Sequence, residues 1–230
     1  MTKAILFDLG NTIIKNINID LRKGFLDLIP ELKNNNKYLK YVDELLIKIN
    51  GRTNIEYPIF DIFKEIELLF NIHFNEDYYE IEYDFYKKAC QDELMDNVIE
   101  VLSFLKNKGL IIGIVSNSLI HQEILMRRLN EFGILKYFNF VLSSQNTIYR
   151  KGDARIFAIA YEEILKINNN IKKDEVLFIG DNLLLDYEAS INYGFKSIWF
   201  NRTNQETDVL SFNNMEKLNK YLEGIIWKKL

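Results

Sequence analysis

The amino-acid sequence predicts an α/β protein with a doubly wound parallel sheet and a smaller helical cap domain. Short apolar runs recur along the 230-residue chain, and helical patterns separate them. One long stretch after the first apolar run shows helical periodicity only. In a doubly wound sheet, ligands bind beyond the carboxyl ends of the strands, so the residues that follow each strand are the first to examine for function.

Five apolar runs predict the strands of the sheet. They lie at residues 4–7, 110–115, 138–142, 175–179 and 197–200. None alternates strictly between apolar and polar residues, which indicates strands that are buried on both faces, as in a parallel sheet.

Three helical patterns, with apolar residues three and four positions apart, occupy residues 97–109, 120–133 and 154–167. The first two end at Gly109 and Gly133, and glycine suits the position after a helix because it readily adopts a left-handed conformation. We expect these helices to cover the sheet of a core made of residues 1–15 and 95–230.

Residues 16–94 are predicted to form the cap. Amphipathic patterns at residues 38–49, 59–70 and 77–90 indicate helices in this stretch. Because the insertion follows the first strand directly, it leaves the core at the carboxyl edge of the sheet. We therefore expect the cap to lie over the site that this edge creates.

Composition narrows the possible partners and compartments. A formal net charge of -4 argues against nucleic acid, because binding to phosphate backbones needs clustered Lys and Arg. The single Cys90 and the two histidines leave no disulfide framework and no Cys/His zinc site, which fits a reducing cytoplasm. We find no secretory signal pattern and no apolar run of roughly 18 residues, so no membrane span is expected.

Polar residues follow four of the predicted strands. In chain order they are Asp8, Ser116 with Asn117, Lys151, and Asp181 with Asp186. A carboxylate can attack phosphorus if a divalent metal offsets the repulsion between two anions and an ammonium stabilises the transferring group.

The residue types match this chemistry. Asp8 is suited to the attack, Asp181 to holding the metal and Lys151 to stabilising charge. Ser116 and Asn117, placed where a strand meets a helix N-terminus, offer donors to phosphate oxygens. The ligands are hard oxygens, so Mg²⁺ is the expected ion.

Four motifs in order resemble the haloacid dehalogenase (HAD) superfamily, most of whose members are Mg²⁺-dependent phosphatases. They are "ILFDLGNT", "IIGIVSNS", "YRKGDARIFAIA" and "VLFIGDNLLLDYEASINYG". The resemblance covers essentially the whole chain, because a helical insertion between the first two motifs is how one cap class of that superfamily is built. It implies a HAD-like Rossmannoid core.

The resemblance also implies roles for individual residues. Asp8 would be the nucleophile that becomes an aspartyl phosphate and a metal ligand, and Lys151 would bridge phosphate and nucleophile. Ser116 would bind phosphate, Asp181 would ligate Mg²⁺, and Asp186 would ligate the ion or orient a ligand. The implied activity is hydrolysis of a small phosphorylated metabolite, by a monomer or a homodimer.

Gly10 departs from the phosphatase pattern, in which a second Asp two residues after the nucleophile protonates the leaving group and activates water. The metal ligand from that position is a backbone carbonyl, which Gly10 still supplies. A general acid or base contributes roughly 10² to 10⁴ in rate, so its loss predicts slow turnover. Two alternatives stay open: a metal-independent dehalogenase, and a non-catalytic phosphate-binding or regulatory protein.

Asp181 and Asp186 favour phosphoryl chemistry over dehalogenation, because a metal-free reaction on a haloacid does not need an acidic metal pocket. Gly152 stands where the superfamily often has proline, which predicts a looser loop. Arg52 is the cap residue that we consider for substrate contact.

Overall fold

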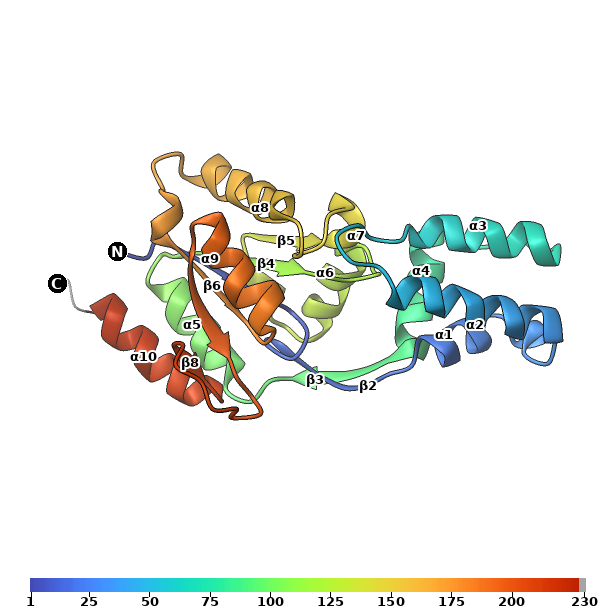
Figure 1. Ribbon diagram of the computed structural model, residues 1–230, viewed down its shortest axis with the longest axis horizontal. Helices are drawn as coiled ribbons and strands as arrows, with labels where there is room; N and C mark the ends of the chain where they lie inside the picture. The colour runs from blue at the N-terminus through green and yellow to red at the C-terminus, as the bar shows by residue number, and fades with distance from the viewer. Residues whose placement is uncertain (228–230) are drawn as a thin grey trace.

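The computed structural model describes residues 1–227 and consists of two lobes, an α/β core and a helical unit at the other end of the long axis (Figure 1). The core contains six parallel strands in the order β5-β4-β1-β6-β7-β8, which confirms the predicted fold class. The strands are β1 (Ala4–Phe7), β4 (Ile111–Ser116), β5 (Phe140–Ser143), β6 (Val176–Gly180), β7 (Lys196–Phe200) and β8 (Ser211–Phe212).

Helices cover both faces of this sheet. Ile5 and Phe7 of β1 belong to the apolar cluster of α5 (Val98–Asn107), α6 (Gln122–Glu131) and α10 (Met215–Trp227). Ala4 and Leu6 point to the opposite face and join the cluster of α8 (Ala154–Ile167), with α9 (Ala189–Tyr193) packed beside it. This alternation explains why β1 is apolar throughout, since both of its faces are buried.

The position of β1 sets the place of the site. β1 pairs with β4 on one side and with β6 on the other. The chain adds β4 and β5 on the first side and then returns to build β6, β7 and β8 on the second. The carboxyl end of β1 is therefore the switch point, where a crevice forms in sheets of this type.

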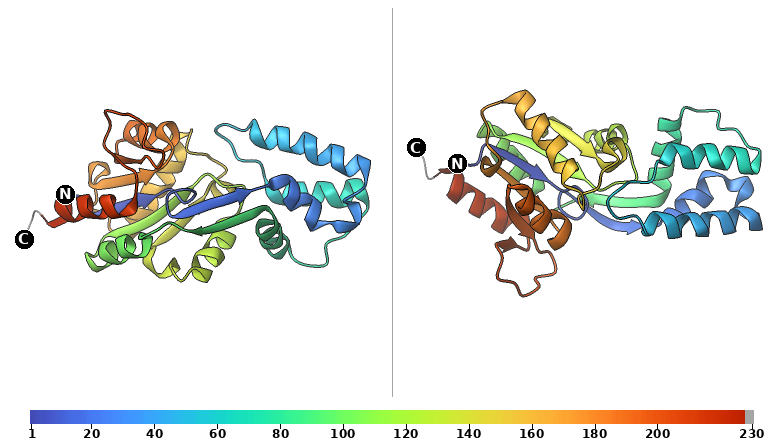
Figure 2. Two further views of the ribbon diagram at one scale, coloured as in Figure 1. Left: turned by 90° about the horizontal axis from the view of Figure 1, so that it is seen from below. Right: turned by 45° about the horizontal axis from the view of Figure 1, so that its top comes forward.

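The helical unit stands apart from the sheet in both views of Figure 2. It contains four α-helices. They are α1 (Leu21–Leu28), α2 (Asn36–Asn50), α3 (Ile59–Phe70) and α4 (Tyr78–Ala89). Side chains of Asn35 and Asp77 accept hydrogen bonds from the first turns of α2 and α4 and so begin these helices.

Both ends of the insertion differ from the helical prediction. β2 (Ile14–Ile19) and β3 (Cys90–Leu94) form an antiparallel pair that joins the helical unit to the core. Most of their side chains are at least partly exposed, so the apolar signal of a strand is weak. The pairing depends on residues more than 70 positions apart in the sequence meeting in space.

The helices predicted in the core lie where expected, and α8 has the predicted bounds of 154–167. Gly109 and Gly133 both have φ of +70°, the left-handed conformation expected after α5 and α6. The helices α1 and α10 were not predicted. The assignment of 16–94 to a cap domain stays a prediction, and residues 228–230 of the predicted core lie outside the described residues.

Within residues 1–227, no helix combines the length and the apolar character that crossing a membrane requires.

The space around Gly113 of β4 is tightly packed, and a larger residue there should change the stability of the protein. A Cβ at this position would lie 2.4 Å from Phe140 Cζ and 2.9 Å from Leu6 Cδ2. We expect Gly113→Ala to lower the free energy of unfolding by about 1–3 kcal/mol, because it overpacks the core. Urea denaturation measures the change.

The matched control is Gly224→Ala in α10, where an added Cβ meets nothing within 4 Å. This substitution should stabilise the protein by about 0.5–1 kcal/mol, because alanine favours the helix. A Gly113→Ala protein as stable as the wild type would contradict the packing described for β4.

Candidate active site

A cavity of about 340 Å³ lies at the carboxyl ends of the strands, with walls from both lobes. Every site residue predicted from the sequence lines it: Asp8, Gly10, Arg52, Ser116, Asn117, Lys151, Asp181 and Asp186. The sheet topology thus gathers residues that are up to 178 positions apart.

Asp8 is buried directly after β1. Its backbone N–H donates to the Ile179 carbonyl at 2.9 Å, which continues the pairing with β6. The Thr12 hydroxyl donates to Asp8 Oδ2 at 3.4 Å, and Lys151 Nζ bonds Oδ1. The chain turns sharply here, since the Leu9 carbonyl accepts from the backbone N–H of Ile13. The turn holds the carboxylate at the edge of the sheet.

Lys151 is buried with its ammonium between two carboxylates. Its Nζ bonds Asp8 and lies 2.5 Å from Asp186 Oδ1. Its backbone N–H donates to Asn117 Oδ1 at 2.7 Å. Asn117, expected to donate to phosphate, thus holds the lysine loop against the end of β4, and Ser116 lines the cavity.

Asp181 and Asp186 reach the same point from the segment after β6. Asp186 lies in a π-helix, Leu183–Glu188, a form that is frequent at functional sites. Asn182 begins this helix by accepting from Leu184 N and Leu185 N, and its own N–H donates to Asp186 Oδ2 at 2.9 Å. A Cβ at Gly180 would lie 2.4 Å from the Asp186 carboxyl carbon, so glycine is needed there.

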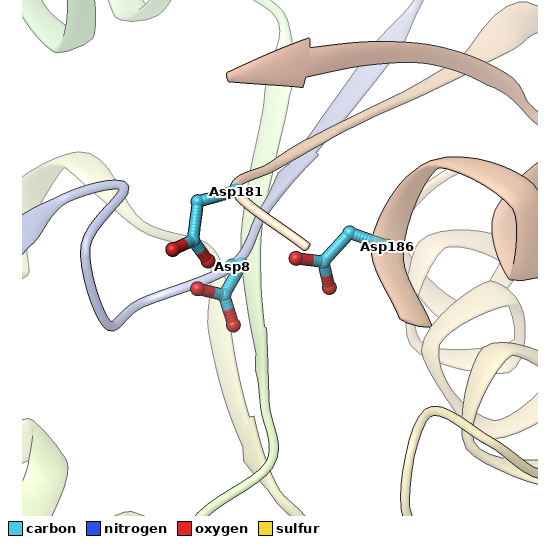
Figure 3. Close-up of side chains that lie close together, drawn as sticks. All are labelled: Asp8, Asp181 and Asp186. Carbon is cyan, nitrogen blue, oxygen red and sulfur yellow. The ribbon is translucent and has the colours of Figure 1, made fainter. Parts of the chain in front are cut away.

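The carboxylates of Asp8, Asp181 and Asp186 face one another (Figure 3). One oxygen from each lies within 4.8 Å of the others. Burial raises the pKa of Asp8 to about 7, against the opposing charge of Lys151, and Asp186 adds to the increase. Burial and the charge of Asp186 also raise the pKa of Asp181.

These carboxylates fit a hard divalent cation such as Mg²⁺. Three oxygen donors with a single ammonium leave an excess of negative charge in a buried place, which is costly without a further cation. A bound cation would favour the ionised form of Asp8 and so oppose the effect of burial on its pKa.

Gly10 also lines the cavity, and β2 brings a new residue beside it. A Cβ at position 10 would lie 3.0 Å from Asn16 Nδ2. Asn16 lines the cavity as well. Sequence reasoning did not identify Asn16, because its approach to Gly10 depends on the turn between β1 and β2.

The helical unit contacts the loop that carries Lys151. The Arg150 N–H donates to the Asn54 carbonyl at 2.9 Å, and the Glu56 N–H donates to the Ile148 carbonyl at 2.8 Å. The segment between α2 and α3 therefore runs alongside the residues that precede Lys151.

A buried carboxylate, Glu56, holds this contact together. It lies 2.5 Å from Arg150 Nη1, accepts from the Ser144 hydroxyl at 2.6 Å and pairs with Arg52. Arg52 also donates to the Ile49 carbonyl. The guanidinium considered for substrate contact is thus engaged in the link between the lobes, although Arg52 lines the cavity.

The structure explains glycine at position 152 by a close contact, not by the looser loop that the sequence predicts. A Cβ there would lie 2.4 Å from Asn54 Oδ1. The absence of a side chain lets the helical unit approach the loop, so a larger residue requires Asn54 to move.

The residues that sequence reasoning missed fall into two kinds. Thr12 and Asn182 lie within the quoted motifs, and their hydrogen-bonding side chains at turn positions were a usable signal. Glu56 carried no such signal, because its partners Ser144 and Arg150 come from a distant part of the chain. The approach of Asn16 to Gly10 depends on the turn between them.

The fold and the strand-end residues agree with a comparison against known families. The model of the haloacid dehalogenase-like hydrolases matches residues 5–200. The chain belongs to this family, and it is a hydrolase.

Solved structures share the fold over nearly the whole chain. A HAD phosphatase from Thermococcus onnurineus is 22% identical with a TM-score of 0.68, covering 97% of this chain and 99% of its own. The HAD-hydrolase YfnB from Bacillus subtilis, bound to magnesium, is 19% identical with a TM-score of 0.60, covering 96% and 99%. A 2-haloacid dehalogenase from Pseudomonas syringae is 17% identical with a TM-score of 0.59, covering 98% and 100%.

One curated relative matches part of the chain. Pyrimidine 5'-nucleotidase PynA from Streptococcus pneumoniae is 35% identical over 74 residues. The match spans 32% of this chain and 30% of the nucleotidase's length.

The link between the lobes can be tested at Glu56. We expect Glu56→Ala to lower the free energy of unfolding by about 3–5 kcal/mol, because it leaves buried guanidinium groups without their carboxylate. Urea denaturation measures the loss. The control, Glu44→Ala, removes a carboxylate that is 61% exposed and 3.7 Å from Lys40, and it should change stability by no more than about 0.5 kcal/mol. Equal effects of the two substitutions would contradict the role of Glu56.

Cys90 lines the cavity but should be a poor nucleophile. Burial raises the pKa of its thiol to about 12, and the charge of Asp92 adds to the effect. Because only the thiolate reacts, we expect iodoacetamide at pH 8 to modify the native protein at least about 10²-fold more slowly than the protein in urea. Mass spectrometry measures both rates, with Cys90→Ser as the blank. Equal rates would show that the native thiol is not protected.

Proposed function

We propose that this hydrolase is a Mg²⁺-dependent phosphatase that cleaves a small phosphomonoester through an aspartyl phosphate at Asp8. The observation that carries the proposal is the buried Lys151 ammonium, bonded to Asp8 and 2.5 Å from Asp186, next to a cluster of three carboxylates. A site with both a nucleophilic carboxylate and positive charge suits the transfer of a dianionic phosphoryl group.

In the proposed mechanism, an oxygen of Asp8 attacks phosphorus and the bond to the leaving group breaks. Lys151 stabilises the charge on the transferring phosphoryl group and holds the Asp8 carboxylate in place. The Ser116 hydroxyl donates to a phosphate oxygen. Mg²⁺, held by Asp8, Asp181, Asp186 and the Gly10 carbonyl, would offset the repulsion between the two anions.

Two of the compared proteins support this reaction class. YfnB is described as bound to magnesium, and PynA is a nucleotidase, which releases phosphate from an ester. The helical unit acts in this proposal as the cap over the cavity, because its α2–α3 segment contacts the loop of Lys151. Asn117 holds that loop through its Oδ1, and its donation to a phosphate oxygen stays a prediction.

The test measures release of inorganic phosphate from 4-nitrophenyl phosphate. We expect Asp8→Asn to lower kcat by at least about 10³-fold, because it removes the nucleophile. Lys151→Met should lower kcat by about 10²–10³-fold through lost charge stabilisation. The control is Lys220→Met, at an exposed ion pair in α10, which should keep wild-type activity. Treatment with EDTA should abolish release, and added Mg²⁺ should restore it.

Other results would overturn the proposal. Full activity of Asp8→Asn would exclude the aspartyl phosphate. Release of halide from a haloacid in EDTA would favour the dehalogenase alternative. Phosphate binding without any turnover would favour a binding or regulatory protein.

A further inference from the structure

The cavity carries an amide side chain beside Gly10. Gly10 has no side chain, and the nearest side-chain atom to its missing Cβ is Asn16 Nδ2 at 3.0 Å. An amide donates a hydrogen bond but does not give up a proton at neutral pH. Asn16 can therefore contact a leaving group without protonating it.

The phenol of Tyr86 and the thiol of Cys90 also line the cavity, and each carries a weakly acidic proton. The Tyr86 hydroxyl already donates to the carboxylate of Asp92. Burial keeps the pKa of both groups well above neutral. Each is therefore a weak acid, and the Tyr86 proton is engaged by Asp92.

The cationic side chains of the cavity are already engaged in ion pairs. Arg52 and Arg150 pair with Glu56, and a guanidinium does not lose its proton in proteins. Lys151 directs its ammonium at Asp8 and Asp186. Asp8, Asp181 and Asp186 are the proposed ligands of the cation. Apart from these three carboxylates, we find no side chain placed to protonate a departing oxygen among the described residues that line the cavity.

From this arrangement we infer that the substrate is a phosphate compound whose leaving group departs as a stable anion, as in acyl phosphates and in enol or aryl phosphate esters. The inference rests on the proposed phosphatase function and narrows its substrate class. Simple alkyl phosphates should be poor substrates.

Atoms and charges balance in the two steps of this hydrolysis without a general acid. The Asp8 carboxylate forms a bond to phosphorus, and the leaving oxygen takes the electron pair of the broken bond as an anion. Water then attacks phosphorus, and Asp8 leaves as a carboxylate again. One proton of that water stays on the released phosphate, and the other passes to solvent.

The acidity of the leaving group decides the barrier of the first step. An alcohol is about as weak an acid as water, whose pKa is about 15.7, so its anion is a poor leaving group. The corresponding pKa is about 10 for a phenol and about 4 for a carboxylic acid. A general acid removes much of this difference in rate, and its contribution is roughly 10²–10⁴-fold.

Aliphatic side chains form part of the cavity wall. Among them are Ile14, Ile19, Leu21, Leu119, Ile120 and Leu125. An aryl or acyl group can pack against this wall, which makes aryl phosphates suitable probes.

The experiment compares kcat/KM with Mg²⁺ for acetyl phosphate, 4-nitrophenyl phosphate, phenyl phosphate and propyl phosphate. We expect kcat/KM to fall steeply as the pKa of the leaving group rises, with propyl phosphate at least about 10²-fold below phenyl phosphate. This comparison uses the wild-type protein, so it does not depend on the folding of any variant.

A pair of variants tests the physical cause. Gly10→Asp supplies a carboxyl group, and the flexible end of Asn16 must shift by only a few tenths of an ångström to admit its Cβ. We expect kcat/KM for propyl phosphate to rise by about 10²-fold or more relative to kcat/KM for 4-nitrophenyl phosphate. Gly10→Asn has the same size but no acidic proton, and it should give no such rise.

The outcomes separate the two proposals. Equal kcat/KM for all four compounds would overturn the leaving-group inference and leave the phosphatase function standing. An equal gain from Gly10→Asn and Gly10→Asp would also overturn it, because the gain would then not come from proton transfer. No phosphate release from any of the compounds would overturn the proposed function itself.

Discussion

The buried ion cluster of Lys151 with Asp8 and Asp186 constrains much of the surrounding structure. Charged groups removed from water are costly unless they are paired and hydrogen-bonded. Each member accordingly has fixed support: Thr12 donates to Asp8, Asn182 donates to Asp186, and Asn117 accepts from the backbone of Lys151. Because each supporting residue follows a strand or begins a helix at the same edge of the sheet, the cluster is held by the regular part of the fold.

Three consecutive residues connect this cluster to the helical unit. Arg150 pairs with Glu56, Lys151 binds the carboxylates, and Gly152 leaves space for Asn54. A change in the position of the α2–α3 segment would therefore act on the loop of Lys151 directly. The apolar cores of the two lobes are also continuous, since residues of α1 to α4 belong to the same cluster as Ile5 and Phe7. The lobes are thus linked both by packing and by a buried ion pair.

A small number of side-chain atoms distinguishes phosphatase chemistry from dehalogenase chemistry in a fold of this kind. This chain shares its fold with a phosphatase and with a dehalogenase at similar TM-scores, so the fold alone does not separate them. The acidic cluster favours a cation, and Lys151 favours an anionic group to be transferred. Gly10 leaves this position without a carboxyl group, so the proposed reaction depends on a leaving group that can depart without a proton donor.

Much of the core was predictable because parallel strands have a strong local signature. The apolar runs around β1, β4 and β6 are buried on both faces, and the polar residue after each run is conspicuous. The same order of strands and helices predicted the shared edge on which Asp8, Lys151 and Asp181 lie. These features depend on residues close together in the sequence and on a general rule of sheet topology.

Other features depend on contacts between distant segments, and no local pattern reveals them. β2 and β3 are mostly exposed and exist as a pair because the two ends of the insertion meet. Glu56 belongs to no motif in the sequence, yet it is buried against Arg150 and Ser144 of the core. The sequence is sufficient to show that position 10 lacks a carboxylate, whereas the amide of Asn16 beside it follows from the turn between β1 and β2.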